Sequence, residues 1–117
     1  MKKVLVVEDN QDLLNILQKR LSDAGFEIDT VEDGHKLLAY MRSAQAPDVV
    51  VLDLMLPERS GIDLLYSLKS KWPQTKVFIF SAYPEYKDKP LFEDYICGFY
   101  NKSDGTAKLI EAIKREL

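Results

Sequence analysis

Three short runs of apolar residues, rich in valine, constrain the fold more than any other feature of the sequence. They span residues 4–7, 49–52 and 77–80, and none of them alternates between apolar and polar side chains. A strand that is apolar on both faces is covered on both faces, as in a parallel sheet between two layers of helices. Weaker extended segments lie at residues 27–31 and near residues 98–101. The sequence thus predicts a five-stranded parallel sheet.

Amphipathic helical patterns lie between these strands, each with its apolar residues on one face. The first pattern ends at Gly25, the second follows Asp33 as a candidate N-cap, and the third runs from Ser60 to just before Pro73. The four apolar stripes are Leu13, Leu14, Ile16, Leu17 and Leu21; Leu37, Leu38 and Met41; Ile62, Leu64, Leu65 and Leu68; and Leu109, Ile110, Ile113 and Leu117.

Strands and helices therefore alternate along the chain, and right-handed crossovers give a doubly wound α/β fold with helices on both faces of the sheet. Residues 82–96 occupy the place of a fourth helix, but they contain Pro84 and Pro90 and have a poor apolar period. We expect a short or distorted helix there. Residues 1–117 are expected to form one domain.

Composition narrows the class of protein. The chain has 117 residues and a net charge of −3, which argues against nucleic-acid binding by this chain alone, since that requires a basic face. No apolar stretch approaches the roughly 18 residues that span a membrane. The single cysteine, Cys97, permits no internal disulfide and is expected to be a small buried residue in a reducing compartment. We expect a cytoplasmic domain.

Polar residues follow the predicted strands at the point where each strand ends. Glu8 and Asp9 follow the first strand, Asp53 the third, Ser81 the fourth and Lys102 the last. Because ligands of doubly wound sheets bind at the carboxyl ends of the strands, these side chains are expected to converge at one edge. Taken singly, an aspartate after a strand is usually a turn or cap residue, and a lysine is usually solvated.

The joint pattern favours a metal and phosphoryl site over those simpler interpretations. Two carboxylates about 5 Å apart repel by roughly 3 kcal/mol at an effective dielectric near 20, so such a cluster needs a cation. Carboxylate oxygens suit Mg²⁺, which commonly uses one or two carboxylates plus a phosphate. One acid is then available to take up a phosphoryl group, with Lys102 and Ser81 compensating its charge.

Four stretches, VLVVEDNQDLLNILQKRL, VVVLDLMLPERSGIDLL, VFIFSA and GFYNK, closely resemble the receiver domain of bacterial response regulators, and the likeness covers essentially the whole chain. The resemblance implies a flavodoxin-like receiver fold with Asp53 as the phosphoacceptor. It further implies that Glu8 and Asp9 form the acidic pair on Mg²⁺, with Asp9 as a direct ligand, and that the backbone carbonyl of Met55 is another ligand.

The same resemblance assigns roles to the remaining site residues. Ser81 matches the hydroxyl residue that follows phosphorylation, and Lys102 matches the lysine that pairs with the phosphoryl group. Phe99 falls at the position of an aromatic switch, and Pro57 and Gly61 match the turn after the acceptor. The chain departs from the family at Ser103, where a proline after a cis peptide is usual, so the geometry of Lys102 is left open.

The resemblance implies a phosphorylation-controlled switch and not a turnover enzyme. A histidine kinase or phosphotransfer protein would phosphorylate Asp53, and an output protein would bind the face made by the fourth helix, the last strand and the last helix. The alternative is a receiver-like interaction module that is no longer phosphorylated. A phosphatase of the haloacid dehalogenase type is disfavoured, because it would want a second aspartate where Met55 stands.

Overall fold

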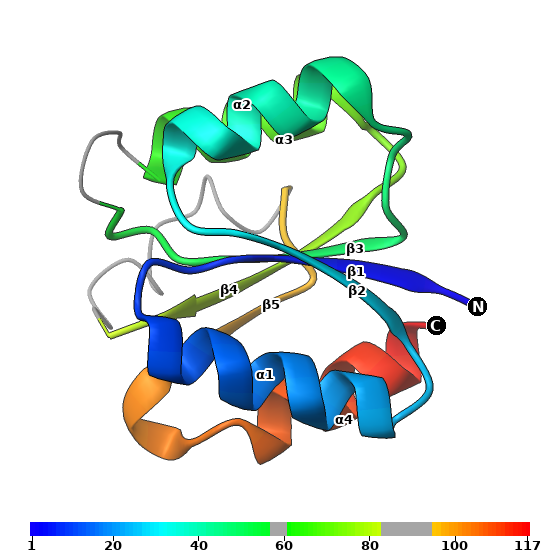
Figure 1. The fold of residues 1–117 in the computed structure, drawn as a ribbon, viewed down its shortest axis with the longest axis vertical. Coiled ribbons are helices and arrows are strands. Elements are labelled where there is room, and N and C mark those ends of the chain that lie inside the picture. Colours follow the sequence, from blue (N-terminus) through cyan, green and yellow to red (C-terminus); the bar gives the residue numbers. More distant parts are fainter. Residues whose placement is uncertain (57–60, 83–94) are drawn as a thin grey trace.

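The structure is a computed structural model that describes residues 1–56, 61–82 and 95–117. Its five strands form one sheet in the order β2-β1-β3-β4-β5, and every neighbouring pair is parallel. The predicted parallel sheet is therefore confirmed (Figure 1). The strands are β1 Lys3–Val7, β2 Glu27–Val31, β3 Val49–Leu52, β4 Lys76–Ser81 and β5 Gly98–Asn101.

Helices cover both faces of this sheet, as the sequence predicts. Helices α2 and α3 lie over one face, and α1 and α4 lie over the other (Figure 1). Residues 83–94 lie outside the described residues, so the short or distorted helix expected there stays a prediction. The described helices are α1 Gln11–Asp23, α2 Gly34–Ser43, α3 Gly61–Lys71, the 3₁₀ helix η3 Lys102–Asp104 and α4 Ala107–Glu116.

The sheet separates two hydrophobic cores because successive side chains of a strand point to opposite faces. In β1, Leu5 and Val7 belong to the α2/α3 core, whereas Val4 and Val6 belong to the α1/α4 core. The same alternation holds in β3, where Val50 and Leu52 face α2 and α3 while Val49 and Val51 face α1 and α4. These strands are continuously apolar because both of their faces are buried.

The start of α2 and the end of α1 follow the predicted local chemistry. Asp33 Oδ1 accepts a hydrogen bond from the backbone N–H of Lys36 at 2.8 Å, which confirms Asp33 as the N-cap of α2. Asn10 caps α1 in the same way, at 3.0 Å from the N–H of Leu13. Gly25 follows the end of α1 with φ of 96°, a left-handed conformation that glycine adopts without steric cost.

Three expectations about burial are wrong. Ile16 is 44% exposed because Leu14, Leu17 and Leu21 define the buried face of α1, and a residue two positions after Leu14 lies almost opposite. Leu117 is 37% exposed because it follows the last residue of α4. Cys97 is also exposed, since it precedes β5, which has one neighbour in the sheet within the described part of the chain. Among the described helices, none is long and apolar enough to span a membrane.

Candidate functional site

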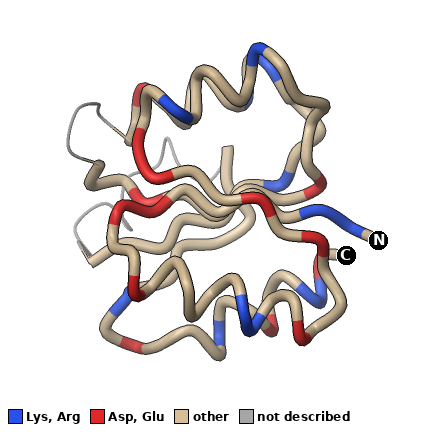
Figure 2. The backbone as a smooth tube through the Cα atoms, in the orientation of Figure 1, with Lys and Arg blue, Asp and Glu red and all other residues tan. Residues whose placement is uncertain are grey.

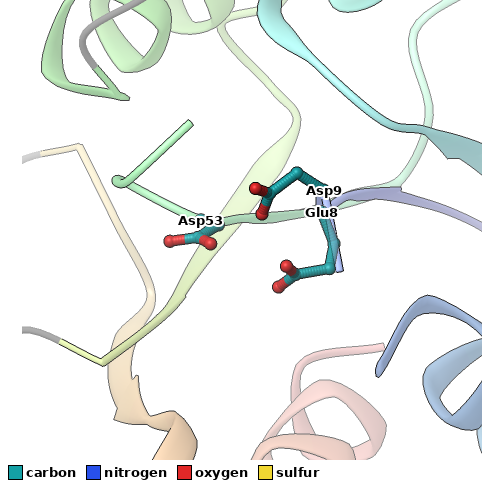
Figure 3. A group of neighbouring side chains, drawn as sticks. All are labelled: Glu8, Asp9 and Asp53. Atoms are coloured by element: carbon teal, nitrogen blue, oxygen red, sulfur yellow. The ribbon is translucent and has the colours of Figure 1, made fainter. Parts of the chain in front are cut away.

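Three acidic side chains gather where β1 and β3 end. Glu8 and Asp9 follow β1, and Asp53 follows β3, its neighbour in the sheet. One carboxylate oxygen from each of these residues lies within 4.8 Å of the others (Figure 3). The strand order reverses between β1 and β3, which is the position where doubly wound sheets bind ligands. In Figure 2 this end of the sheet, on the left of the view, is marked by acidic positions.

The three acids differ in exposure. Glu8 and Asp53 are each only 2% exposed, whereas Asp9 is exposed. The backbone holds the two strand ends together, because the N–H of Asp53 donates to the carbonyl oxygen of Val7 at 3.2 Å. The cluster therefore has two buried carboxylates at its base and one at its solvent side.

Lys102 offsets part of the negative charge of the two buried acids. Its Nζ lies 2.6 Å from Asp53 Oδ2 and 2.8 Å from Glu8 Oε1, and its side chain is 22% exposed. Burial raises the pKa of Glu8, although hydrogen bonds from Lys102 and from the backbone N–H of Asn10 oppose the shift. Burial lowers the pKa of Lys102, but hydrogen bonds and charge from Asp53 and Glu8 outweigh that effect and raise it overall.

Asp53 uses both carboxylate oxygens. Oδ2 accepts from Lys102, and Oδ1 accepts from the backbone N–H of Met55 at 2.9 Å. Met55 is 43% exposed, and the contact that it makes with the acid is through its backbone N–H. The structure thus places Met55 beside Asp53, and the role of its carbonyl oxygen as a metal ligand stays a prediction.

The first residue of α3 contacts the residue that follows Asp53. The N–H of Gly61 donates to the carbonyl oxygen of Leu54 at 3.2 Å. This contact brings the backbone of Gly61 close to that of Leu54. Pro57, the other predicted turn residue, lies outside the described residues.

Ser81 ends β4, the other neighbour of β3. It is fully buried, and its Oγ has no hydrogen-bond partner among the described residues. A buried polar group without a partner costs about 1–3 kcal/mol, so the position suits a hydroxyl that meets a ligand oxygen. Ser81 pairs in register with Asn101, the residue before Lys102, so the predicted hydroxyl and amine come from adjacent strand ends.

The last strand positions Phe99 and Lys102. Phe99 is half-buried against the α2/α3 core and pairs with Ile79 of β4. The peptide between Lys102 and Ser103 is trans, which answers the question that the missing proline raised. Sequence reasoning missed the roles of Asn10, whose N–H donates to Glu8 Oε2 at 3.0 Å, and of Asn101. Asn10 directly follows the acidic pair after β1, Asn101 is the last residue of β5, and each precedes a helical turn; this position is the sequence feature that could have identified them.

A doubly wound parallel sheet whose carboxyl edge carries two buried acids, a lysine and a hydroxyl without a partner among the described residues has the features of a signalling domain of the α/β type. The sequence matches the response regulator receiver domain family over residues 4–114, and the chain belongs to that family.

Comparisons with curated proteins agree. The chain is 41% identical to TcrX of Mycobacterium tuberculosis over 95 residues, which cover 81% of this chain and 38% of TcrX. It is 29% identical to the alkaline phosphatase synthesis transcriptional regulatory protein PhoP of Bacillus subtilis over 119 residues, which cover 97% of this chain and 49% of PhoP. The chain thus spans about half or less of the length of these relatives.

Solved structures share the fold over the whole chain. The response regulator TrrA of Thermotoga maritima, determined in complex with Mg²⁺-BeF, has a TM-score of 0.88 and 31% sequence identity, with 100% of both chains covered. The chemotaxis response regulator CheY4 of Vibrio cholerae has a TM-score of 0.86 and 26% identity, with 100% of this chain and 99% of that chain covered.

Proposed function

We propose that Asp53 accepts a phosphoryl group from the phosphohistidine of a histidine kinase or phosphotransfer protein. The observation that supports this most is the environment of Asp53, which is buried at a strand end between Lys102 and the acids Glu8 and Asp9. A carboxylate oxygen of Asp53 forms the new O–P bond as the P–N bond of the donor breaks, and the leaving nitrogen keeps the electron pair.

The donor set at this rim fits Mg²⁺. Glu8, Asp9 and Asp53 offer hard carboxylate oxygens within 4.8 Å of one another, and the family resemblance adds the carbonyl oxygen of Met55. When bound, the ion would supply positive charge against the phosphoryl oxygens. The complex of the related TrrA with Mg²⁺-BeF supports this assignment.

Two side chains of the chain itself complete the proposed chemistry. Lys102, already within 2.6 Å of Asp53, offsets the charge that the phosphoryl group adds. Ser81 has a hydroxyl without a partner among the described residues, and it donates to a phosphoryl oxygen once the group is in place. Lys102 and Ser81 assist the transfer but do not carry the phosphoryl group, which is bound to Asp53 of the same chain. The domain therefore promotes its own phosphorylation and dephosphorylation and is not a turnover enzyme.

The output is a change in protein contacts. Phosphorylation shifts an existing equilibrium between two conformations, and the movement of Ser81 leaves space into which Phe99 turns. The face made by β5, the last helix and the fourth helix predicted from the sequence then binds an output protein in the cytoplasm with altered affinity. Residues 83–94 of that predicted helix lie outside the described residues. We propose no contact with nucleic acid or membrane by this chain alone.

Acetyl phosphate with Mg²⁺ tests the proposal without knowledge of the kinase. The protein is expected to gain the mass of one phosphoryl group, and Asp53→Asn is expected to gain none. Asp23→Asn is the matched control, because Asp23 is an exposed acid at the end of α1 that pairs only with Lys19 among the described ion pairs. Absence of any mass gain, with acetyl phosphate or with histidine-kinase donors, would favour the unphosphorylated interaction module instead.

A further inference from the structure

The peptide group between Lys102 and Ser103 is hydrogen-bonded at both of its polar atoms. Its N–H, which belongs to Ser103, donates to Asn101 Oδ1 at 2.9 Å. Its carbonyl oxygen, which belongs to Lys102, accepts from the N–H of Gly105 at 3.2 Å. Because a planar peptide held at both ends cannot rotate freely, these two bonds fix the direction in which the side chain of Lys102 leaves the backbone.

Asn101 is the side chain responsible for the first of these bonds. It is the N-cap of η3 and the last residue of β5, where it pairs in register with Ser81. Its Oδ1 also accepts from the hydroxyl of Ser103 at 2.8 Å, so one oxygen organises both donors of that serine. Asparagine suits this place because its short side chain can bond to a backbone N–H two residues further on.

The hydrogen bond to Asn101 requires the backbone N–H of Ser103. A proline at this position, as is usual in the family, has no N–H to give to Asn101. Here the N–H is present, the peptide is trans, and Gly105 closes the turn with φ of 79°. Asn101 and Ser103 thus form a local substitute for the rigidity that a proline ring would provide.

We infer that Asn101 is a positioning residue: by capping the turn Lys102–Asp104 through Ser103, it holds the Lys102 ammonium against Asp53 and Glu8 for phosphoryl transfer. The inference rests on the proposed phosphorylation of Asp53. It concerns how the lysine is placed in this chain, where the lysine is followed by serine and its Nζ lies 2.6 Å from Asp53 and 2.8 Å from Glu8.

A set of variants separates positioning from general stability. Asn101→Ala is expected to lower the limiting rate of phosphorylation by acetyl phosphate and Mg²⁺ by about three- to tenfold, which corresponds to the usual loss of an N-cap, with little change in the half-saturating donor concentration. Asn101→Asp keeps the acceptor oxygen and is expected to restore most of the rate. Asn15→Ala is the matched control, because Asn15 is an exposed asparagine of α1 whose Oδ1, among the described residues, accepts only from Gln11.

A double variant tests whether Asn101 acts through Lys102. In a Lys102→Ala background, Asn101→Ala should cause no further loss of rate, because the lysine through which it acts is gone. An equal loss in both backgrounds would overturn the inference, as would a wild-type rate in Asn101→Ala. A wild-type chain that takes up no phosphoryl group would instead overturn the proposed function.

Amide hydrogen exchange of Ser103 provides a readout without metal or phosphoryl donor. The exchange of this N–H is expected to accelerate about three- to tenfold in Asn101→Ala and to return toward the wild-type rate in Asn101→Asp. Unchanged exchange in Asn101→Ala would show that the capping bond does not hold the turn in solution, and the inference would fail even if phosphorylation of Asp53 is observed.

Discussion

A Cβ placed on Gly61 would lie 2.3 Å from the Cα atom of Leu54 and 2.5 Å from its carbonyl oxygen. Both obstacles are backbone atoms of the residue that follows Asp53, so neither can move aside without displacing the acceptor. The absence of a side chain at position 61 is therefore a condition for the geometry around Asp53.

Gly61→Ala is expected to destabilise the fold by about 2–3 kcal/mol, since overpacking against backbone forces the chain to shift. It should also slow phosphorylation, because the shifted chain includes Leu54. Gly25→Ala is the control: Gly25 has φ of 96° but nothing within 4 Å of its would-be Cβ, so only a conformational cost of about 1–2 kcal/mol applies. Urea unfolding and the acetyl phosphate assay measure both effects, and equal phosphorylation rates for the two variants would contradict the prediction.

Lys102→Ala leaves the buried carboxylates of Glu8 and Asp53 without their cation. In the absence of metal, we expect the free energy of unfolding to fall by about 1–3 kcal/mol. On addition of Mg²⁺, we expect the melting temperature to rise more than in the wild type, because no ammonium competes for the same oxygens. Lys36→Ala removes only an exposed pair with Glu32 at 3.1 Å and should change neither quantity appreciably. A smaller response to Mg²⁺ in Lys102→Ala would contradict this prediction.

Ser81→Ala should separate stability from function. Since Ser81 Oγ is buried without a described partner, its removal is expected to stabilise the unphosphorylated protein by about 1 kcal/mol while impairing the response to phosphorylation. Thr75→Val makes the comparison, because the buried Thr75 Oγ1 donates to the carbonyl oxygen of Pro47 at 2.8 Å and its loss should destabilise by about 1–2 kcal/mol. Chemical denaturation is expected to show that the free energy of unfolding rises in Ser81→Ala and falls in Thr75→Val. Destabilisation of Ser81→Ala would contradict this prediction.

The contribution of Tyr40 to the free energy of unfolding is expected to fall at alkaline pH. Its hydroxyl donates to Asp29 Oδ2 at 2.6 Å, and burial, followed by this bond and the charge of Asp29, raises the pKa of Tyr40 well above its usual range. Below about pH 10 the tyrosine is protonated in both states and the contribution, about 1 kcal/mol for a partly exposed pair, is complete. Above that pH the unfolded chain loses its proton first, so the contribution falls as pH rises toward the folded-state pKa.

The variant Tyr40→Phe should therefore be less stable than the wild type at pH 7, with the difference shrinking above about pH 10. Urea unfolding at a series of pH values measures this difference. A gap that stays constant or widens with pH would contradict the assigned sign.

Much of this architecture could be predicted from local patterns. The runs around Val4, Val50 and Val77 predict strands that are buried on both faces, and Glu8, Asp53 and Ser81 directly follow these three runs. Lys102 follows the weaker extended segment at residues 98–101. The convergence of Lys102 with Glu8 and Asp53 at one edge follows from topology, because parallel strands bring their carboxyl ends together, whereas the two ion pairs are seen only in the structure.

Other features depend on contacts that a pattern does not encode. Ile16 belongs to the apolar stripe by residue type, but a difference of one position around the helix decides whether it is buried. The turn at Asn101 depends on a side-chain torsion and on the donor that Ser103 supplies, neither of which the family resemblance contains. Exposure of Cys97 depends on the position of β5 in the strand order.

Strand β5 lies at the border of the sheet and, within the described part of the chain, forms a ladder with β4 alone. Consecutive residues of this strand enter different cores: Phe99 packs on the side of α2 and α3, and Tyr100 on the side of α1 and α4. If Lys102 moved and shifted β5 along β4, only the hydrogen bonds between these two strands would have to break. The shift would nevertheless change the packing against both helical layers. Phosphorylation of Asp53 would in this way alter the packing of the helices on both faces of the sheet.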